Sequence, residues 1–353
     1  MIDASLKRID KSNMYERING FFQQILDGIT IGKEARLGNL PGMEFDNIVL
    51  AGMGGSAIAG DLLKSILRDE LRTPFAVHRN YGLPEYVGKD SFVICSSYSG
   101  NTEETLSAFQ TALERGCSIL CISTGGMLSE YAEKNNIPLI KIPSGMMPRE
   151  ALGLSLTPLL ITFGRLGFIR DYSTELSDTA GYLRNLIDEY KFEAPKNIAF
   201  ELAEKLTGKI VVIYAGPDWL DSAALRFKGQ ICENAKQLAF CNVFPEFNHN
   251  ELVGWELSGS FSDKYVVLII HDKGDHPQIV KRMEAVSEIL SKNNIEVIEL
   301  FSRGDSLLTR ILSIVQLADY TSYYLALKNR VDPTPIRLID YLKEKITGNR
   351  GNK

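Results

Sequence analysis

A cluster of hydroxyl side chains in the stretch SSYSGNT, residues 96–102, is the clearest chemical feature of the sequence. It follows the apolar run FVIC and precedes a helical pattern, so it lies where a strand ends and a helix begins. In open α/β sheets, ligands bind at this position, where a helix start offers unpaired N–H groups and positive partial charge. The hydroxyls add hydrogen bonds, and Gly100 permits close backbone approach. The loop therefore suits a phosphomonoester.

Helix capping is a simpler interpretation of the same loop. Capping by Asn101 or Thr102 accounts for one polar side chain, but it does not require several hydroxyls. Walker-type nucleotide binding is disfavoured because no Gly-Lys-Ser or Gly-Lys-Thr follows either glycine-rich loop. GMGGSAIAG, residues 52–60, is similar to a dinucleotide-binding loop but lacks the acidic residue expected at the end of a following strand. We therefore favour anion binding.

A glutamate at the end of a predicted helix is the first candidate for acid–base chemistry. In FKGQICENAK, helical spacing places Phe227 and Ile231 on the buried side and Glu233 on another face, near Arg226. A glutamate in such a position most often belongs to a solvated polar face. Spacing alone therefore does not separate a catalytic carboxylate from a surface charge.

His249 and Arg149 are the other candidates. His249 lies between two asparagines in FPEFNHNELVGWE, which also holds Glu246, Glu251 and Glu256. No second histidine has a metal-ligand spacing to it, so a hydrogen-bonding loop histidine is the simpler interpretation, and the roles of the three glutamates stay open. Arg149 follows a proline at a predicted helix start, where an arginine is usually a surface charge.

The elements that must position these residues alternate between strand and helix in each half of the chain. NIVLAG, SFVICS and SILCIS are each followed by a helical pattern, and KIVVIYAG, KYVVLIIH and IEVIELF repeat the arrangement. This order predicts parallel pairing through right-handed crossovers. The predicted fold class is therefore α/β, with two doubly wound, mainly parallel sheets and helices on both faces. One very wide sheet is less favoured, because each half already forms a complete unit.

The predicted organisation has five segments along the chain. They are an N-terminal helical segment (1–40), a first domain with the anion loop (41–170), a linker helix (171–194), a second domain (195–330) and a C-terminal tail ending in a helix (331–353). The second half carries HDKGDHP in place of the hydroxyl loop, and its acids would repel an anion. Only the first half is therefore expected to bind phosphate.

Composition narrows the classes of function. The chain has 353 residues, 44% hydrophobic and 24% charged, with a net charge of −5 and no long basic run, which disfavours nucleic acid as a partner. Pro158 and Arg165 interrupt its most apolar segment, Ala151–Phe168, so we expect a buried helix there and no membrane span. The N-terminus lacks the apolar core of a secretory signal, and the five cysteines show no paired spacing. These features predict a reduced, cytoplasmic protein.

Taken together, several stretches resemble one family. GMGGSAIAGDL, SSYSGNTEET, PREALG, CENAK, FNHNELVGWE and DPTPIRLIDYLKEKI occur in unbroken order from about Phe45 to Ile346. This combination is similar to the bifunctional phosphoglucose/phosphomannose isomerases, which belong to the phosphoglucose isomerase superfamily and contain two sugar-isomerase (SIS) domains. The resemblance implies interconversion of glucose 6-phosphate and mannose 6-phosphate with fructose 6-phosphate, without a metal or other cofactor.

The resemblance also implies a role for individual residues. The phosphate would be held by Ser97, Ser99 and Thr102, and the sugar pocket would be lined by Gly55, Ser56 and Thr334. Glu233 would move a proton between C1 and C2, and Arg149 would stabilise the enediolate. Lys343 and His249 would assist ring opening, with His249 supplied by the partner subunit of a homodimer.

Three rival interpretations remain at this point. SIS domains also occur as sugar-phosphate sensors, which keep the phosphate loop but need no base, histidine or terminal lysine. A glutamine-dependent hexosamine synthase is disfavoured, because no N-terminal cysteine amidotransferase domain is present. An isomerase of a different phosphorylated sugar keeps the whole site and changes only the substrate.

Overall fold

Two parallel sheets form the frame of the protein, for which a computed structural model describes residues 4–348. The first sheet has the order β2-β1-β3-β4-β5, and the second has the order β7-β6-β8-β9. The strands of the first are β1 (Asn47–Gly52), β2 (Phe75–His78), β3 (Ser91–Ser96), β4 (Ser118–Ser123) and β5 (Leu139–Lys141). Those of the second are β6 (Ile210–Ala215), β7 (Ala239–Val243), β8 (Tyr265–His271) and β9 (Glu296–Phe301). The predicted α/β class with two doubly wound sheets is confirmed.

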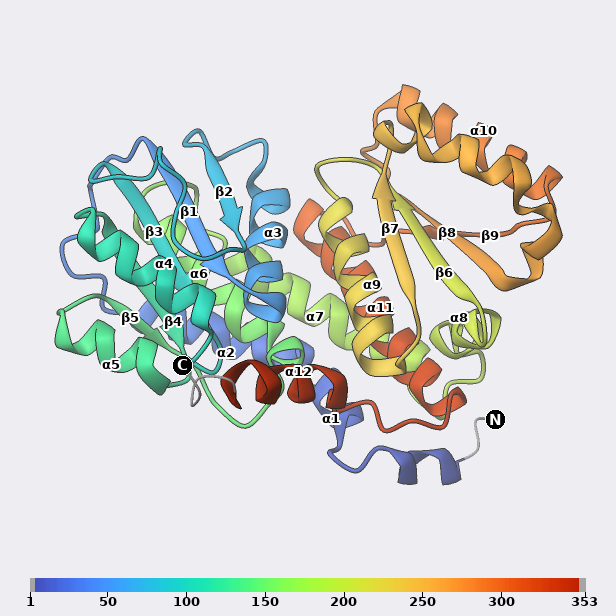
Figure 1. The fold of residues 1–353 in the computed structure, drawn as a ribbon, viewed down its shortest axis with the longest axis horizontal. Coiled ribbons are helices and arrows are strands. Elements are labelled where there is room, and N and C mark those ends of the chain that lie inside the picture. Colours follow the sequence, from blue (N-terminus) through green and yellow to red (C-terminus); the bar gives the residue numbers. More distant parts are fainter. Residues whose placement is uncertain (1–3, 349–353) are drawn as a thin grey trace.

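Helices cover both faces of each sheet (Figure 1). Those of the first half are α3 (Gly54–Leu67), α4 (Glu103–Glu114), α5 (Gly126–Lys134) and α6 (Leu152–Arg165), preceded by η1 (Ala4–Ile9), α1 (Met14–Asn19) and α2 (Phe21–Glu34). The second half contains α8 (Ile198–Leu206), α9 (Asp221–Ala235), α10 (Pro277–Lys292) and α11 (Leu307–Lys328), and α7 (Ser173–Tyr190) precedes it. Short 3-10 segments are η2 (Pro148–Glu150), η3 (Glu246–His249) and η4 (Glu251–Lys264). Strands covered on both faces explain the nearly continuous apolar runs of β1, β3, β6 and β8.

The two halves pack through helices rather than through strands. α3 contacts α9, and α11 packs on α7, α8 and α9, so one apolar core runs across both halves. α6 is buried along its length despite Pro158, as the sequence predicts. No helix within residues 4–348 is long and apolar enough to cross a bilayer.

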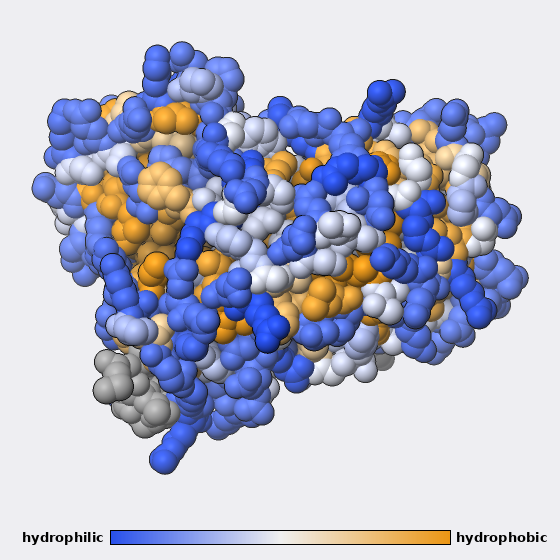
Figure 2. Space-filling view, turned by 180° about the vertical axis from the view of Figure 1, so that it is seen from behind, coloured by the Kyte–Doolittle hydropathy of each residue, from blue (hydrophilic) through white to orange (hydrophobic). Residues whose placement is uncertain are grey.

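The C-terminal helix α12 (Arg337–Gly348) lies apart from this core, below the carboxyl ends of the first sheet in the view of Figure 1. Several of its apolar side chains are exposed, among them Leu338 and Leu342. A C-terminal helix is confirmed, although residues 1–3 and 349–353 of the predicted terminal segments lie outside the described residues. Hydrophilic residues cover most of the rear of the molecule, with separate apolar areas between them (Figure 2).

Candidate active site

The hydroxyl loop lies at the carboxyl end of β3, immediately before α4. Ser97 and Thr102 are hydrogen-bonded to each other through their hydroxyl oxygens at 2.9 Å, and the Gly100 N–H donates to Ser97 Oγ at 3.1 Å. Thr102 takes the N-cap position of α4, but its hydroxyl bonds Ser97 rather than a helix N–H. Capping therefore does not account for these hydroxyls. Ser99 is exposed at the tip of the loop.

Glycines allow two close approaches around this loop. Gly100 has a φ of +71°, and a Cβ there would lie 1.8 Å from the carbonyl oxygen of Gly125. Gly55, in the first turn of α3, packs against the backbone of Pro148 and Arg149, where a Cβ would lie 2.8 Å from the Pro148 carbonyl. Ser56 is buried beside Gly55, and its hydroxyl accepts a hydrogen bond from the N–H of Tyr98 at 3.1 Å. The glycine loop thus joins the hydroxyl loop to the segment that carries Arg149.

Arg149 is a buried hub and not the surface charge that its sequence position favours, because only 3% of it is exposed. Its Nε donates to Asn234 Oδ1 at 2.7 Å, and its Nη2 donates to the carbonyls of Pro333 and Thr334 at 2.9 and 2.8 Å. Its Nη1 lies 3.5 Å from Glu233 Oε2. Burial lowers the pKa of the Arg149 guanidinium, while the nearby carboxylate of Glu233 opposes that shift.

Glu233 lies in the last turn of α9, with a third of its side chain exposed. The polar face of this helix is buried at Arg226 and Gln230 and only partly exposed at Glu233, which corrects the interpretation of a solvated face. Arg226 donates to both carboxylate oxygens of Asp319 at 2.9 Å, and Gln230 donates to the same carboxylate at 2.6 Å. All three side chains are buried, so α9 is fixed against α11 and Glu233 is held beside Arg149.

A cavity of about 850 Å³ borders Glu233 on its open side. Its wall combines apolar side chains of the tail, such as Ile336 and Ile339, with the basic residues Arg8, Lys236 and Arg337. Lys236 was not singled out from the sequence. Its ammonium donates to the carbonyls of Glu233 and Pro333 at 2.7 and 3.0 Å. Partial burial, helped by the charge of Arg149, lowers the pKa of Lys236 to about 8.

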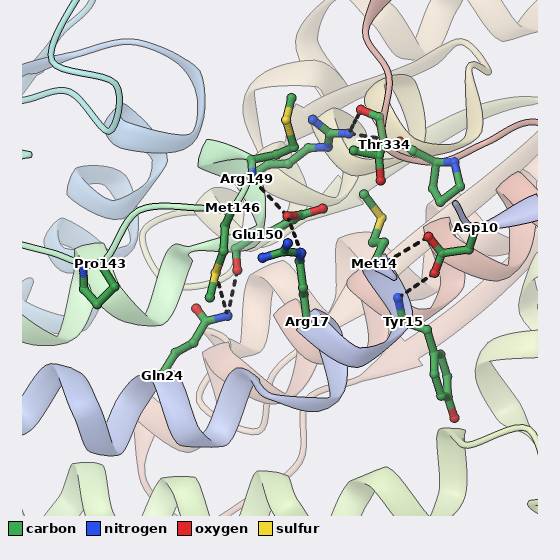
Figure 3. A network of polar contacts seen from close by, with 12 residues as sticks. Asp10, Met14, Tyr15, Arg17, Gln24, Pro143, Met146, Arg149, Glu150 and Thr334 are labelled. Atoms are coloured by element: carbon green, nitrogen blue, oxygen red, sulfur yellow. Dashed lines mark hydrogen bonds and ion pairs between the residues drawn. The ribbon is translucent and has the colours of Figure 1, made fainter. Parts of the chain in front are cut away.

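The C-terminal tail places Thr334 beside Arg149 (Figure 3). Its backbone carbonyl accepts from Arg149, and its hydroxyl oxygen is buried without a hydrogen-bond partner. Lys343 lies farther along, on the exposed helix α12. The structure thus brings Gly55, Arg149, Glu233 and Thr334 together and leaves Lys343 on a neighbouring element.

Within one folded chain, His249 lies at the opposite edge of the second sheet from Glu233. Glu233 is at the end of α9, just before β7 begins, whereas His249 is in η3, just after β7 ends. A strand of 5 residues separates these two edges of the second sheet by about 16 Å. One chain therefore does not bring the histidine to the glutamate.

Two glutamates of the segment that carries His249 form hydrogen bonds that hold this segment in place. Glu251 accepts hydrogen bonds from the Tyr214 hydroxyl and from Asn242 Nδ2, and Glu246 accepts one from Asn250 Nδ2 at 3.0 Å. Two of the three glutamates therefore hydrogen-bond residues of this segment and of the second sheet, and none of these three contacts involves the His249 side chain. Within residues 4–348, no group of three or more histidine, cysteine, aspartate or glutamate side chains is arranged to hold a metal ion.

The fold and the site define a class of protein with two SIS domains. The SIS domain profile matches residues 44–143, and the profile of the bacterial phospho-glucose isomerase C-terminal SIS domain matches residues 195–346. Solved structures share this fold at low sequence identity. A hypothetical protein from Thermus thermophilus superposes with a TM-score of 0.72 at 14% identity over 96% of this chain and 91% of that one. For the tagatose-6-phosphate ketose/aldose isomerase of Escherichia coli, the TM-score is 0.68 at 16% identity, over 92% and 96%.

Sequence relatives are more specific. The bifunctional phosphoglucose/phosphomannose isomerase of Caldicellulosiruptor bescii is 42% identical over 94% of this chain and 98% of its own length. The enzyme of the same name from Aquifex aeolicus is 35% identical over the same shares. The D-glucosamine-6-phosphate 4-epimerase of Sulfolobus acidocaldarius is 29% identical over 95% of this chain and 97% of its own. The chain belongs to the bifunctional phosphoglucose/phosphomannose isomerase family.

Proposed function

We propose that this protein is an aldose–ketose isomerase that interconverts glucose 6-phosphate and mannose 6-phosphate with fructose 6-phosphate. The observation that carries the proposal is the pair formed by Glu233 and Arg149, with 3.5 Å between Oε2 and Nη1, beside an anion-type loop. Isomerisation of this kind removes a weakly acidic proton next to a carbonyl and stabilises the oxyanion that develops. A carboxylate and a guanidinium at this distance supply both requirements.

In the proposed mechanism, the phosphate binds Ser97, Ser99 and Thr102, whose hydroxyls turn from one another to the anion. Glu233 takes the proton from C2 of the open-chain aldose and returns it to C1 on the same face of the planar cis-enediolate, because the two carbons are adjacent. The proton of the C2 hydroxyl moves to the oxygen on C1, which completes the ketose. The Nη1 group of Arg149, which faces Glu233, stabilises the oxyanion, since Nε and Nη2 are already bonded to Asn234 and the tail. No step requires a metal or another cofactor.

Three further residues complete the proposed site. The hydroxyl of Thr334, buried beside Arg149 without a partner, is a pocket group that could contact the sugar at C2 in either configuration. We place Gly55 and Ser56 on the side of the sugar that faces the first sheet, because Gly55 packs against Arg149 and Ser56 bonds Tyr98 of the hydroxyl loop. Lys343 assists ring opening from α12, which Figure 1 shows below the carboxyl ends of the same sheet.

We further propose a homodimer in which His249 of each chain serves the site of the other. The position of His249 at the far edge of the second sheet supports this arrangement, because its own chain does not bring it to Glu233. Charge supports it as well. The cavity beside Glu233 has basic residues in its wall, whereas the segment around His249 carries Glu246, Glu251 and Glu256. The predicted cytoplasmic location and the five-segment division of the chain remain part of this proposal.

Coupled assays in excess EDTA test the function. One follows fructose 6-phosphate to glucose 6-phosphate, and the other follows mannose 6-phosphate to fructose 6-phosphate. We expect turnover in both, and loss of both in Glu233→Gln. Binding of fructose 6-phosphate without turnover would favour a sensor.

The relative named as a glucosamine-6-phosphate epimerase makes a second activity worth measuring, because it aligns over 95% of this chain. Epimerisation of glucosamine 6-phosphate in the absence of both isomerase activities would replace the proposed substrates. An epimerase of this kind would still use the phosphate loop, but Glu233 would have a different role.

A further inference from the structure

Arg149 is carried by a segment with little regular structure of its own. Residues 143–150 run from the end of β5 to α6 and contain only the single 3-10 turn η2. A buried guanidinium on such a segment is placed by whatever holds the backbone around it. Two side chains from distant parts of the sequence do so, Tyr98 in the hydroxyl loop and Gln24 in α2.

Tyr98 links the hydroxyl loop directly to this segment. Its phenol donates to the Pro143 carbonyl at 3.0 Å and accepts from the Met146 N–H at 3.1 Å. Its backbone is fixed in turn, because its N–H donates to Ser56 Oγ and its carbonyl accepts from the hydroxyl of Thr124 at 2.8 Å. Only 7% of the residue is exposed. The loop proposed to bind phosphate and the segment that carries Arg149 are therefore hydrogen-bonded to each other through Tyr98.

Gln24 holds the other end of the segment (Figure 3). Its Nε2 donates to the carbonyl of Glu150 at 2.8 Å, and its Oε1 accepts from the N–H of Gly153 at 3.2 Å. The adjacent carboxylate of Glu150 accepts from the Met147 N–H at 2.9 Å and lies 3.4 Å from Arg17 Nε of α1. Helices α1 and α2 thus brace the backbone on both sides of Arg149.

We infer that Tyr98 and Gln24 are positioning residues of the isomerase site, which fix the guanidinium of Arg149 relative to the bound phosphate and to Glu233. Neither side chain contacts the substrate in this scheme, and both act through Arg149. The inference rests on the proposed function. It predicts that loosening either contact lowers the rate of the chemical step while phosphate binding stays intact.

Tyr98→Phe is the first test, because it removes one hydroxyl and keeps the ring. We expect kcat for fructose 6-phosphate to fall about tenfold to a hundredfold, as a small misplacement of a catalytic group can produce. We expect KM and the inhibition constant of inorganic phosphate to change by less than about threefold. Gln24→Met tests the same segment from α2 if Tyr98→Phe does not fold, with the same expected pattern.

A matched control separates positioning from general stability. The phenol of Tyr172 donates to Glu70 Oε2 at 2.8 Å and is as deeply buried, but it lies at the start of α7. Tyr172→Phe should lower the melting temperature by a similar amount and leave kcat unchanged. If Tyr98→Phe behaves like this control, Tyr98 is structural only and the inference is wrong.

A double-mutant cycle tests whether Tyr98 acts through Arg149. In an Arg149→Lys background the forked guanidinium is gone, so Tyr98→Phe should cost almost nothing more in kcat. Full additivity of the two losses would overturn the inference even if each single variant is slow. The wild-type protein is measured in the same assay. If the wild-type protein is inactive, the proposed function is wrong; if it is active and the losses are additive, only the inference about Tyr98 is wrong.

Discussion

Mixing two inactive variants offers a stringent test of the proposed shared site. Glu233→Gln removes the base from one edge of the second sheet, and His249→Ala removes the histidine from the other. If His249 serves the partner's site, a mixed dimer contains one site with both substitutions and one site with neither. Activity should therefore return when the two inactive proteins exchange subunits.

The size of the recovery follows from counting sites. Equal amounts of the two variants re-pair at random, so half of the dimers are mixed and one site in each mixed dimer is intact, which gives about a quarter of wild-type activity. Each parent should retain about 1% or less, because loss of a general acid or base costs two to four orders of magnitude in rate. The expected rise is then at least about twentyfold, well within the range of a coupled assay.

Glu233→Gln mixed with Arg149→Lys is the matched control. Glu233 and Arg149 belong to the same site in one chain, 3.5 Å apart, so every site of their mixed dimer keeps one defect. This mixture should stay inactive. Mass spectrometry of differently tagged chains would verify exchange. If the Glu233→Gln and His249→Ala chains exchange but activity does not return, the proposal that His249 serves the partner's site is refuted.

Three other predictions follow from the described contacts. Ser97→Ala combined with Thr102→Ala should raise KM and the inhibition constant of inorganic phosphate about tenfold or more, with kcat less affected; equal inhibition of mutant and parent would contradict the phosphate assignment. Asp319→Asn leaves the buried Arg226 without a counter-charge and should lower the free energy of unfolding by about 3–5 kcal/mol in urea titrations, and a loss below about 1 kcal/mol would show that the pair is dispensable. Burial raises the pKa of Asp275 from 3.8 to about 6, so its contribution to stability is present below pH 3.8 and is lost as pH rises through 6. Asp275→Asn should therefore raise the melting temperature most at pH 8, less at pH 5 and hardly at all below pH 3.8, and equal shifts at pH 8 and below pH 3.8 would reject this account.

The main elements of the fold were predictable because their signals are local. Runs such as VVLII and the helical patterns after them reflect burial of strands on both faces and of helices on one. Two edge strands, β2 and β7, were not predicted. Both are short, and most of their residues are only partly buried, so their sequences lack a continuous apolar run. They exist because a neighbouring strand offers its free edge, which is a tertiary effect.

The site was predictable only in part for a related reason. The hydroxyl loop is contiguous, so its residue types alone indicate an anion. Arg149 and Glu233 are 84 positions apart in numbering, and nothing in their spacing shows that they meet. Asp319 had one available signal, since it is a lone carboxylate within the long buried helix α11. A buried acid of that kind requires a partner, and its partner, Arg226, fixes the helix that carries Glu233.

The second half of the chain explains why we propose an anion site only in the first half, although the fold is repeated. Asp272 follows β8 as Ser97 follows β3, so its carboxylate lies at the corresponding carboxyl end. It accepts hydrogen bonds from the Gly274 N–H, the Ser302 hydroxyl and Arg310 Nε, at 2.7, 2.6 and 2.8 Å. An internal carboxylate therefore uses the donors that an external phosphate would need, which agrees with the acids seen in HDKGDHP. Since the carboxyl end of β8 is occupied in this way, the second half contributes to the proposed site of its own chain from the opposite edge, where α9 carries Glu233 to Arg149.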